Sequence, residues 1–142
     1  MEEVHEEKTL YQAIGGADKL REMVDRFYDL MALETEFEKI RVLHPTAMDQ
    51  SRDKLFWFLS GWMGGPDLYI QQFGHPRLRA RHLPYAIGVA ERDQWLRCMA
   101  WAMQDVGIET GLQEHLMHSF FQTADWMRNQ QEQAHDDQAL GT

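Results

Sequence analysis

The sequence predicts an all-α fold, and three observations lead to this prediction. Apolar residues recur at spacings of three and four along four long segments, which is the period of an amphipathic helix. Glycine and proline residues separate these segments. Strand signals are almost absent, because there is no Asn-Gly hairpin and no sustained alternation of apolar and polar residues. The length of 142 residues fits one domain.

The first half of the chain contains two of the four strong helical patterns. Residues 17–33 follow a break at two glycines and carry one apolar stripe, formed by Leu20, Met23, Val24, Phe27, Leu30 and Met31. Residues 36–47 lack clear periodicity. The next helix is expected from about Asp49 to Met63. The run Gly64-Gly65-Pro66 should end it, because glycine caps a helix and proline cannot continue it.

The second half is expected to hold two short helices and two long ones. A short helix is predicted near residues 68–72, and a second has Pro84 in its first turn, a position that tolerates proline. A long helix over residues 90–106 follows a weak capping-box pattern formed by Gly88 and Glu91. The last helix is expected over residues 109–128.

The two ends of the chain differ from its middle in composition. Residues 1–8 are charged and are expected to be loose, and residues 130–142 are polar and are expected to be disordered. The expected folded domain therefore spans residues 9–129.

Charge and composition exclude several classes of protein. A net charge of −9 argues against nucleic-acid binding, which relies on Lys and Arg. The N-terminus lacks the layout of a signal peptide, and no run approaches 18 apolar residues, so neither secretion nor a membrane span is expected. Cys98 is the single cysteine, which excludes an intrachain disulfide and suits the cytoplasm. Five Trp and nine Met indicate either a soft, aromatic core or a pocket for a large flat cofactor.

The strongest candidate for a cofactor ligand is His82. It lies in the run PRLRARHLP, together with Arg77, Arg79 and Arg81, in a chain that is otherwise acidic. Haem requires an axial imidazole, an apolar slot and cations for its two propionates. This segment supplies the first and the third. Taken alone, a histidine beside arginines is also compatible with a purely structural role.

Other polar residues on the predicted helices remain open between chemistry and packing. Tyr28, Ser51 and Trp95 each offer a hydrogen-bond donor, but each also fits an ordinary place in a core or at a helix start. His115 and His118 share one helix face without an evident third metal ligand, which favours a surface pair.

Five stretches between residues 9 and 103 resemble the group II truncated haemoglobins, a family of bacterial truncated globins. They are LYQAIGG, RFYDLM, FWFLSGWMGGPDLY, GHPRLRARHLPYAIG and ERDQWLRCM. The most specific part is the H-P-R-L-R-x-R-H-x-P-[FY] run, followed by E-R-D-x-W-L. The resemblance implies a two-on-two helical sandwich around haem b.

The resemblance also implies roles for individual residues. His82 corresponds to the proximal iron ligand, Tyr28 to the distal tyrosine, and Trp95 to the tryptophan typical of group II. His44 corresponds to a corner position that is Tyr or His in the family, and Ser51 to a distal position that is His in many globins. Two further sets are implied: Leu55 and Phe58 on the distal side, and Tyr69, His75, Arg79 and Arg81 at the propionates or haem edge.

Two functional classes follow from the resemblance. In the first, the haem reversibly binds oxygen, carbon monoxide or nitric oxide, for oxygen transport, sensing or scavenging. Donors stabilise an anionic ligand, each by about 1.5–3 kcal/mol, and His44 is titratable near neutral pH, which suits donating or relaying a proton. In the second, the same haem serves a nitric-oxide dioxygenase or a peroxidase-like enzyme. Such an enzyme needs a reductase, and the chain shows no flavin or nicotinamide motif.

Some questions stay open at this stage. A helical interaction module without haem is a third class, which predicts a colourless protein. The oligomeric state, including a homodimer, is not decided by the sequence.

Overall fold

A computed structural model describes residues 8–130, which are helical and contain no strand. Apart from Lys8 and Gln130, the expected loose N-terminal segment and polar tail lie outside the described residues. The elements in chain order are α1 (Leu10–Ile14), α2 (Ala17–Leu33), the 3-10 helix η1 (Thr35–Phe37), α3 (Glu38–Arg41), α4 (Asp49–Trp62), α5 (Leu68–Phe73), α6 (Leu78–His82), α7 (Val89–Asp105) and α8 (Thr110–Trp126).

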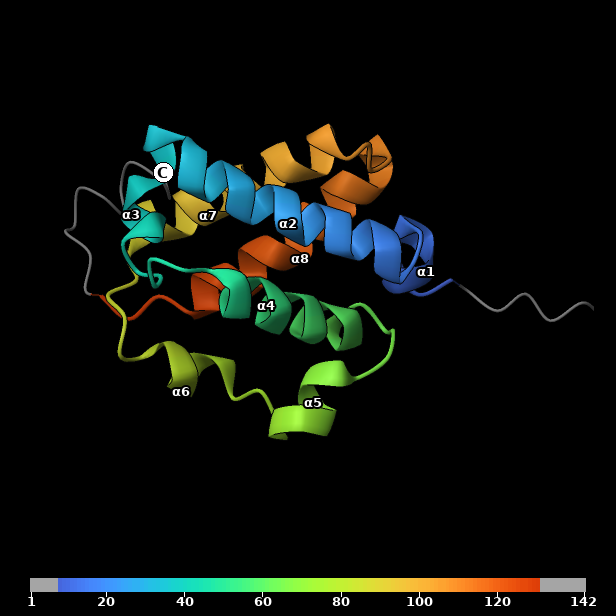
Figure 1. Ribbon diagram of the computed structural model, residues 1–142, viewed down its shortest axis with the longest axis horizontal. Coiled ribbons are helices and arrows are strands. Elements are labelled where there is room, and N and C mark those ends of the chain that lie inside the picture. The colour runs from blue at the N-terminus through green and yellow to red at the C-terminus, as the bar shows by residue number, and fades with distance from the viewer. Residues whose placement is uncertain (1–7, 131–142) are drawn as a thin grey trace, which may run out of the picture.

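Four long helices form the body of the molecule, which we call the bundle: α2, α4, α7 and α8. Helix α2 packs against both α4 and α7, and α7 packs against α8 (Figure 1). The all-α prediction and the four long helices are thus confirmed, with boundaries that differ from the expected ones by no more than two residues. No helix in the described part of the chain is both long and apolar enough to cross a membrane.

Methionines and leucines, rather than tryptophans, fill the core of the bundle. Seven methionines are buried: Met23, Met31, Met48, Met63, Met99, Met103 and Met127. None of the five tryptophans is, and Trp126 is 60% exposed. The methionines therefore account for the soft core, whereas most of the tryptophans line its edges.

Two glycines fix the sharp turn after α4. Gly64 has a φ of +87°, which glycine adopts without the steric penalty of a side chain. Gly65 lies against Tyr11, since a Cβ atom there would come within 2.5 Å of the Tyr11 ring. Helix α1 itself begins with a capping box in which Thr9 and Gln12 bond each other's backbone N–H. The glycines therefore end α4 and also give α1 room to pack on the turn.

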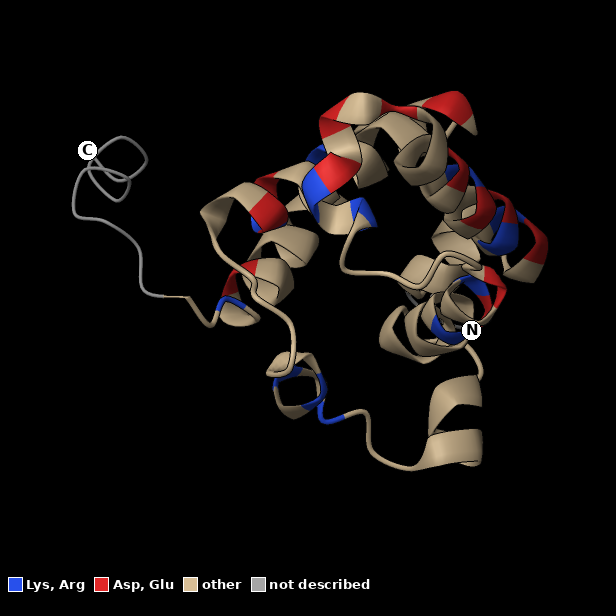
Figure 2. Ribbon diagram, turned by 60° about the vertical axis from the view of Figure 1, so that its left-hand side comes forward, with Lys and Arg blue, Asp and Glu red and all other residues tan. Residues whose placement is uncertain are grey.

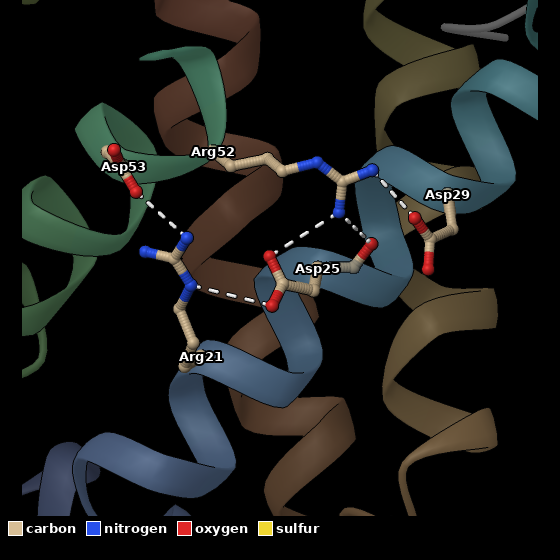
Figure 3. A network of polar contacts seen from close by, with 5 residues as sticks. All are labelled: Arg21, Asp25, Asp29, Arg52 and Asp53. Atoms are coloured by element: carbon tan, nitrogen blue, oxygen red, sulfur yellow. Dashed lines mark hydrogen bonds and ion pairs between the residues drawn. The ribbon is translucent and has the colours of Figure 1, made fainter. Parts of the chain in front are cut away.

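A network of arginine and aspartate side chains ties the start of α4 to α2 (Figure 3). Arg52 donates to the Asp29 carboxylate at 2.6 Å and to the Asp25 carbonyl at 2.9 Å. Arg21 lies 2.8 Å from the Asp53 carboxylate and 3.4 Å from that of Asp25. Exposed ion pairs contribute only about 0–1 kcal/mol each. As a network, they fix the register of α4 against α2.

The segment from Pro66 to Ala86, which we call the arm, is built differently. It contains α5 and α6, and no residue in it is buried. Figure 1 shows both short helices along one edge of the molecule, with α5 next to α4. Apolar side chains on the arm are therefore left partly or largely exposed, among them Ile70, Phe73, Leu83 and Tyr85.

The prediction of a short helix with Pro84 in its first turn is wrong. The short helix α6 ends at His82, before the proline, and Tyr85 N–H closes a turn onto the His82 carbonyl at 3.0 Å. Arg77 starts α6 in the left-handed conformation, with a φ of +48°, and its N–H donates to His75 Nδ1 at 3.2 Å. This local turn, rather than the proline, positions the helix.

Candidate functional site

His82, the last residue of α6, is oriented by a hydrogen bond to its own helix. Its Nδ1 lies 2.7 Å from the Leu78 carbonyl oxygen. A carbonyl only accepts, so Nδ1 carries the proton and Nε2 keeps its lone pair. Histidines that ligate metals commonly donate their other ring N–H in this way. The partly buried His82 is thus prepared to ligate through Nε2.

A row of ring contacts crosses the bundle and draws on all four of its helices. The consecutive centroid distances lie between 4.9 and 5.7 Å, and the pair from α4 and α8 is stacked within 8° of parallel. The members of this aromatic row, in order, are Trp62, Phe120, Trp95, Phe27, Tyr28 and His44. Such a row provides a rigid apolar wall.

Three polar atoms predicted for the distal side are free to bind a ligand. Within residues 8–130, neither hydroxyl of Tyr28 and Ser51 nor the Trp95 indole N–H has a hydrogen-bond partner. None of the three is among the fully enclosed unpartnered atoms, so each borders accessible space. By contrast, the buried Ser60 hydroxyl donates to the Pro66 carbonyl at 2.7 Å.

Burial raises the pKa of Tyr28 far above its usual range. A positive charge on Arg52, whose guanidinium lies 5.8 Å from the Tyr28 ring centroid, opposes this rise only in part. Tyr28 therefore stays protonated at any physiological pH and can donate a hydrogen bond.

His44 meets Tyr28 edge to face, with ring centroids 5.7 Å apart. Its Nδ1 lies 2.8 Å from the Ile40 carbonyl, so Nδ1 donates and Nε2 has only a lone pair. Burial lowers the pKa of His44, the bond to the Ile40 carbonyl opposes this in part, and the charge of Arg41 lowers the pKa further. The ring is therefore neutral near pH 7, and its Nε2 accepts a hydrogen bond, whereas the sequence suggested that His44 donates or relays a proton.

Leu55 and Phe58, expected on the distal side, lie on α4 and pack against the core. Phe58 and Tyr69 also border a cavity of about 160 Å³ between α4 and the arm. The whole lining is Trp57, Phe58, Gly61, Trp62, Asp67, Tyr69, Ile70 and Pro76. This places Tyr69 of the arm against α4. From the sequence, Tyr69 was expected at the edge of the cofactor.

The basic residues of α6 lie apart from the acidic ones. In Figure 2 the ribbon of this short helix carries the colour of basic residues and none of acidic ones, in contrast to the mixed charges of the long helices. Arg81 donates to the Pro76 carbonyl at 2.8 Å, with its guanidinium 5.7 Å from the Tyr69 ring centroid. Arg79 bonds the Arg128 carbonyl at 3.3 Å. His75 is exposed and accepts a bond at Nδ1, which leaves its Nε2–H as a donor.

Three residues that contact the site were not expected from the sequence: Trp62 and Phe120 of the aromatic row, and Asn129, which donates to the His82 carbonyl. Trp62 lies one helical turn after Phe58, so its spacing was a usable signal. Phe120 and Asn129 are far from the other site residues in sequence and gave none. The pair His115 and His118 lies exposed on α8, and the described residues contain no cluster of three metal-ligating side chains.

The fold and the site define a helical protein in which an aromatic row crosses the bundle and the histidine of α6, His82, has its Nδ1 engaged by a backbone carbonyl. A family model described as bacterial-like globin matches residues 9–129, so the chain belongs to this family. It is 39% identical to the group 2 truncated hemoglobin YjbI of Bacillus subtilis, over 86% of this chain and 89% of that protein.

Solved structures of related proteins agree with this assignment. The cold-adapted truncated hemoglobin of Pseudoalteromonas haloplanktis TAC125 is 41% identical, with a TM-score of 0.84 over 87% of this chain and 100% of that one. The group II 2-on-2 hemoglobin of Agrobacterium tumefaciens is 39% identical, with a TM-score of 0.85 over 91% and 100%. The fold is therefore a truncated two-on-two globin, as expected. Membership of the globin family implies haem binding.

Proposed function

We propose that this protein holds haem b through His82 Nε2 and reversibly binds oxygen and other diatomic ligands on the opposite face. The observation that carries this proposal is the bond from His82 Nδ1–H to the Leu78 carbonyl, which leaves Nε2 as the ligating atom. Bound haem supplies an iron with one open coordination position. A related protein from Bacillus subtilis, 38% identical with a TM-score of 0.78, is described as an oxygen-avid truncated haemoglobin.

The exposed apolar side chains of the arm support a large flat cofactor. The arm has no buried residue, yet its helix α5 carries four apolar or aromatic residues and no charge. Covering apolar surface stabilises by roughly 25 cal/mol per Å². A porphyrin held by His82 would cover part of the apolar surface that the arm leaves exposed. Arg79, Arg81 and His75 offer donors for the propionates at its edge.

The three free donors give the proposed distal side its chemistry. Tyr28, Ser51 and Trp95 each have a donor that no other described residue uses. A bound diatomic ligand with partial negative charge accepts hydrogen bonds from them. Each bond to a charged group contributes about 1.5–3 kcal/mol, so two or three of them slow ligand release by several powers of ten. Ser51 is too short to reach the iron, so a sixth position stays open to the ligand.

An absorption spectrum of the purified, dithionite-reduced protein tests this proposal, before and after carbon monoxide is added. We expect an intense haem band that shifts on addition of carbon monoxide, because the sixth position is accessible. A colourless protein that also fails to bind added haemin would overturn the proposal.

A further inference from the structure

The chain that follows α8 returns to the arm and forms a cluster of hydrogen bonds there. Asn129 is central to it, and it is the only asparagine in the sequence. Its Nδ2 donates to the His82 carbonyl at 3.1 Å and to the Tyr85 carbonyl at 2.7 Å. Its Oδ1 accepts from Ile87 N–H at 3.0 Å, and its own N–H donates to the Ile87 carbonyl at 2.9 Å. One side chain therefore contacts the backbone at three points between residues 82 and 87.

Helix α6 has few other means of holding its place. It is five residues long, and it contains no buried side chain. A helix of this length is not stable on its own, because nucleation costs more than a few hydrogen bonds return. Its position must come from contacts with the rest of the molecule. The bond from Arg79 to the Arg128 carbonyl, at 3.3 Å, joins α6 to the same segment.

The anchor on the other side of these bonds is firm. Asp125, in the last turn of α8, accepts from Arg92 of α7 at 2.7 Å. The Arg92 side chain is only 7% exposed, and its guanidinium also lies 5.0 Å from the Phe121 ring centroid. Helices α7 and α8 thus hold the chain end from which Asn129 reaches the arm.

We propose that Asn129 is the positioning residue for the proximal ligand, fixing where His82 stands relative to the iron. The inference rests on the proposed function, since it needs haem at His82. The Leu78 carbonyl fixes the rotation of the imidazole, whereas Asn129 fixes the backbone that carries it. A ligand held at both points stays at a defined distance and tilt. Loss of one point lets α6 shift and changes the strength of the iron–histidine bond.

The test uses the iron–histidine stretching band in the resonance Raman spectrum of the reduced, ligand-free protein. Asn129→Asp is isosteric and keeps the acceptor for Ile87 N–H, but it replaces both donated bonds with repulsion between oxygen atoms. Asn129→Ala removes all three side-chain bonds to residues 82–87. We expect a shifted or broadened band in both variants, and a haem-dissociation rate that rises several-fold.

Two controls separate positioning from general destabilisation. Gln122→Glu adds the same charge as Asn129→Asp at an exposed position on α8 and should leave the band unchanged. Leu112→Ala weakens the packing of α8 and lowers the free energy of unfolding, without contact to the arm, and should also leave it unchanged. If Asn129→Ala fails to fold, the iron–histidine band of the isosteric variant Asn129→Asp still tests the proposal.

The two proposals fail in different ways. Normal haem content in all variants, with an unaltered band and an unaltered dissociation rate, would overturn the role of Asn129 and leave the proposed function intact. A wild-type protein that binds no haem would overturn both. A band that moves equally in Leu112→Ala would show that stability, not position, controls it.

Discussion

The bundle and the arm are held together by different means. The bundle has its own core, whose fully buried side chains include Leu20, Met23, Phe27, Met99 and Leu116. It also has ion-pair networks between its helices, such as the one around Arg52. The arm, from Pro66 to Ala86, has no buried residue: its helix α5 packs on the surface of α4, and hydrogen bonds attach its second half to the segment after α8.

This difference indicates that the fold depends mainly on the bundle, whereas the proposed function also depends on the arm. A core that is complete in the chain alone can form without a cofactor. The exposed apolar side chains of the arm need a further molecule to cover them, and the proposed porphyrin is apolar enough to do so. The residue proposed to hold the iron lies on the arm, whereas Tyr28 and Trp95 lie on the bundle. The proposed distal donors therefore lie on the rigid part of the molecule, whereas the proposed iron ligand depends on the hydrogen bonds that hold the arm.

The largest effect is expected from His82→Ala. This variant removes the only side chain proposed to bond the iron, and we expect the purified protein to lose most of its haem. Haem content per chain, measured by absorbance, checks this. His115→Ala, which changes an exposed histidine on α8, is the matched control and should keep its haem. Full haem content with an unaltered ferrous spectrum in His82→Ala would show that the ligand lies elsewhere.

Removal of the haem should separate the two regions directly. We expect amide hydrogen exchange over residues 66–86 to accelerate by orders of magnitude in the haem-free protein, because none of these residues is buried. Exchange in α2 and α7 should change little, since their buried contacts are formed by the chain itself. Exchange followed by mass spectrometry measures both regions in one experiment. Equal acceleration in the two regions would contradict the distinction between bundle and arm.

A smaller effect should follow from a change on the bundle. Trp95→Phe keeps the ring contacts with Phe27 and Phe120 but removes the indole N–H. The loss of one hydrogen bond to a charged ligand costs about 1.5–3 kcal/mol, so oxygen release should become about ten- to hundredfold faster. Stopped-flow measurement of oxygen dissociation gives the rate.

Trp101→Phe is the matched control for this prediction. Trp101 lies on the same helix and packs against Phe37, with ring centroids 5.9 Å apart. The substitution should leave oxygen release unaltered. An unchanged rate in Trp95→Phe would exclude its indole as a donor to the ligand.

The sequence predicted the bundle far better than the arm, and the reason is physical. Helix α2 was placed at residues 17–33, its exact bounds, because its apolar stripe repeats over more than four turns and is buried. Helices α1 and α3, with five and four residues, are too short to show a period. The prediction of a helix with Pro84 in its first turn was wrong, because α6 starts earlier, at the left-handed turn of Arg77. The spacing of apolar residues does not predict that conformation.

The candidate site divides in the same way. The motif that contains His82 was readable, since its residues are adjacent in sequence. The contact of Asn129 with this motif joins residues 47 apart, and no local pattern predicts it. The engagement of His44 Nδ1 by the Ile40 carbonyl also had no signal, because Ile40 lies in a segment without clear periodicity. The chemical identity of site residues was thus accessible, and their protonation was not.

The smallest effect is expected from His44, which lies where the bundle faces the arm. Burial and the charge of Arg41 lower its pKa in the folded state below the ordinary value of 6.5. Above that pH the histidine is neutral in both the folded and the unfolded chain, so it has no effect on stability. As the pH falls through 6.5, the unfolded chain takes up a proton first, and the folded state loses stability by at most about 1.4 kcal/mol per pH unit. The loss levels off below the folded-state pKa. His44→Phe should therefore show a shallower acid-side decline in the free energy of unfolding, and the two proteins should run parallel above about pH 7.5. Urea titrations of both proteins across this range measure the difference in the free energy of unfolding. Curves that stay parallel down to pH 5 would show that His44 takes up its proton as readily in the folded chain as in the unfolded one. The part of the aromatic row formed by His44 and Tyr28 would then be open to water.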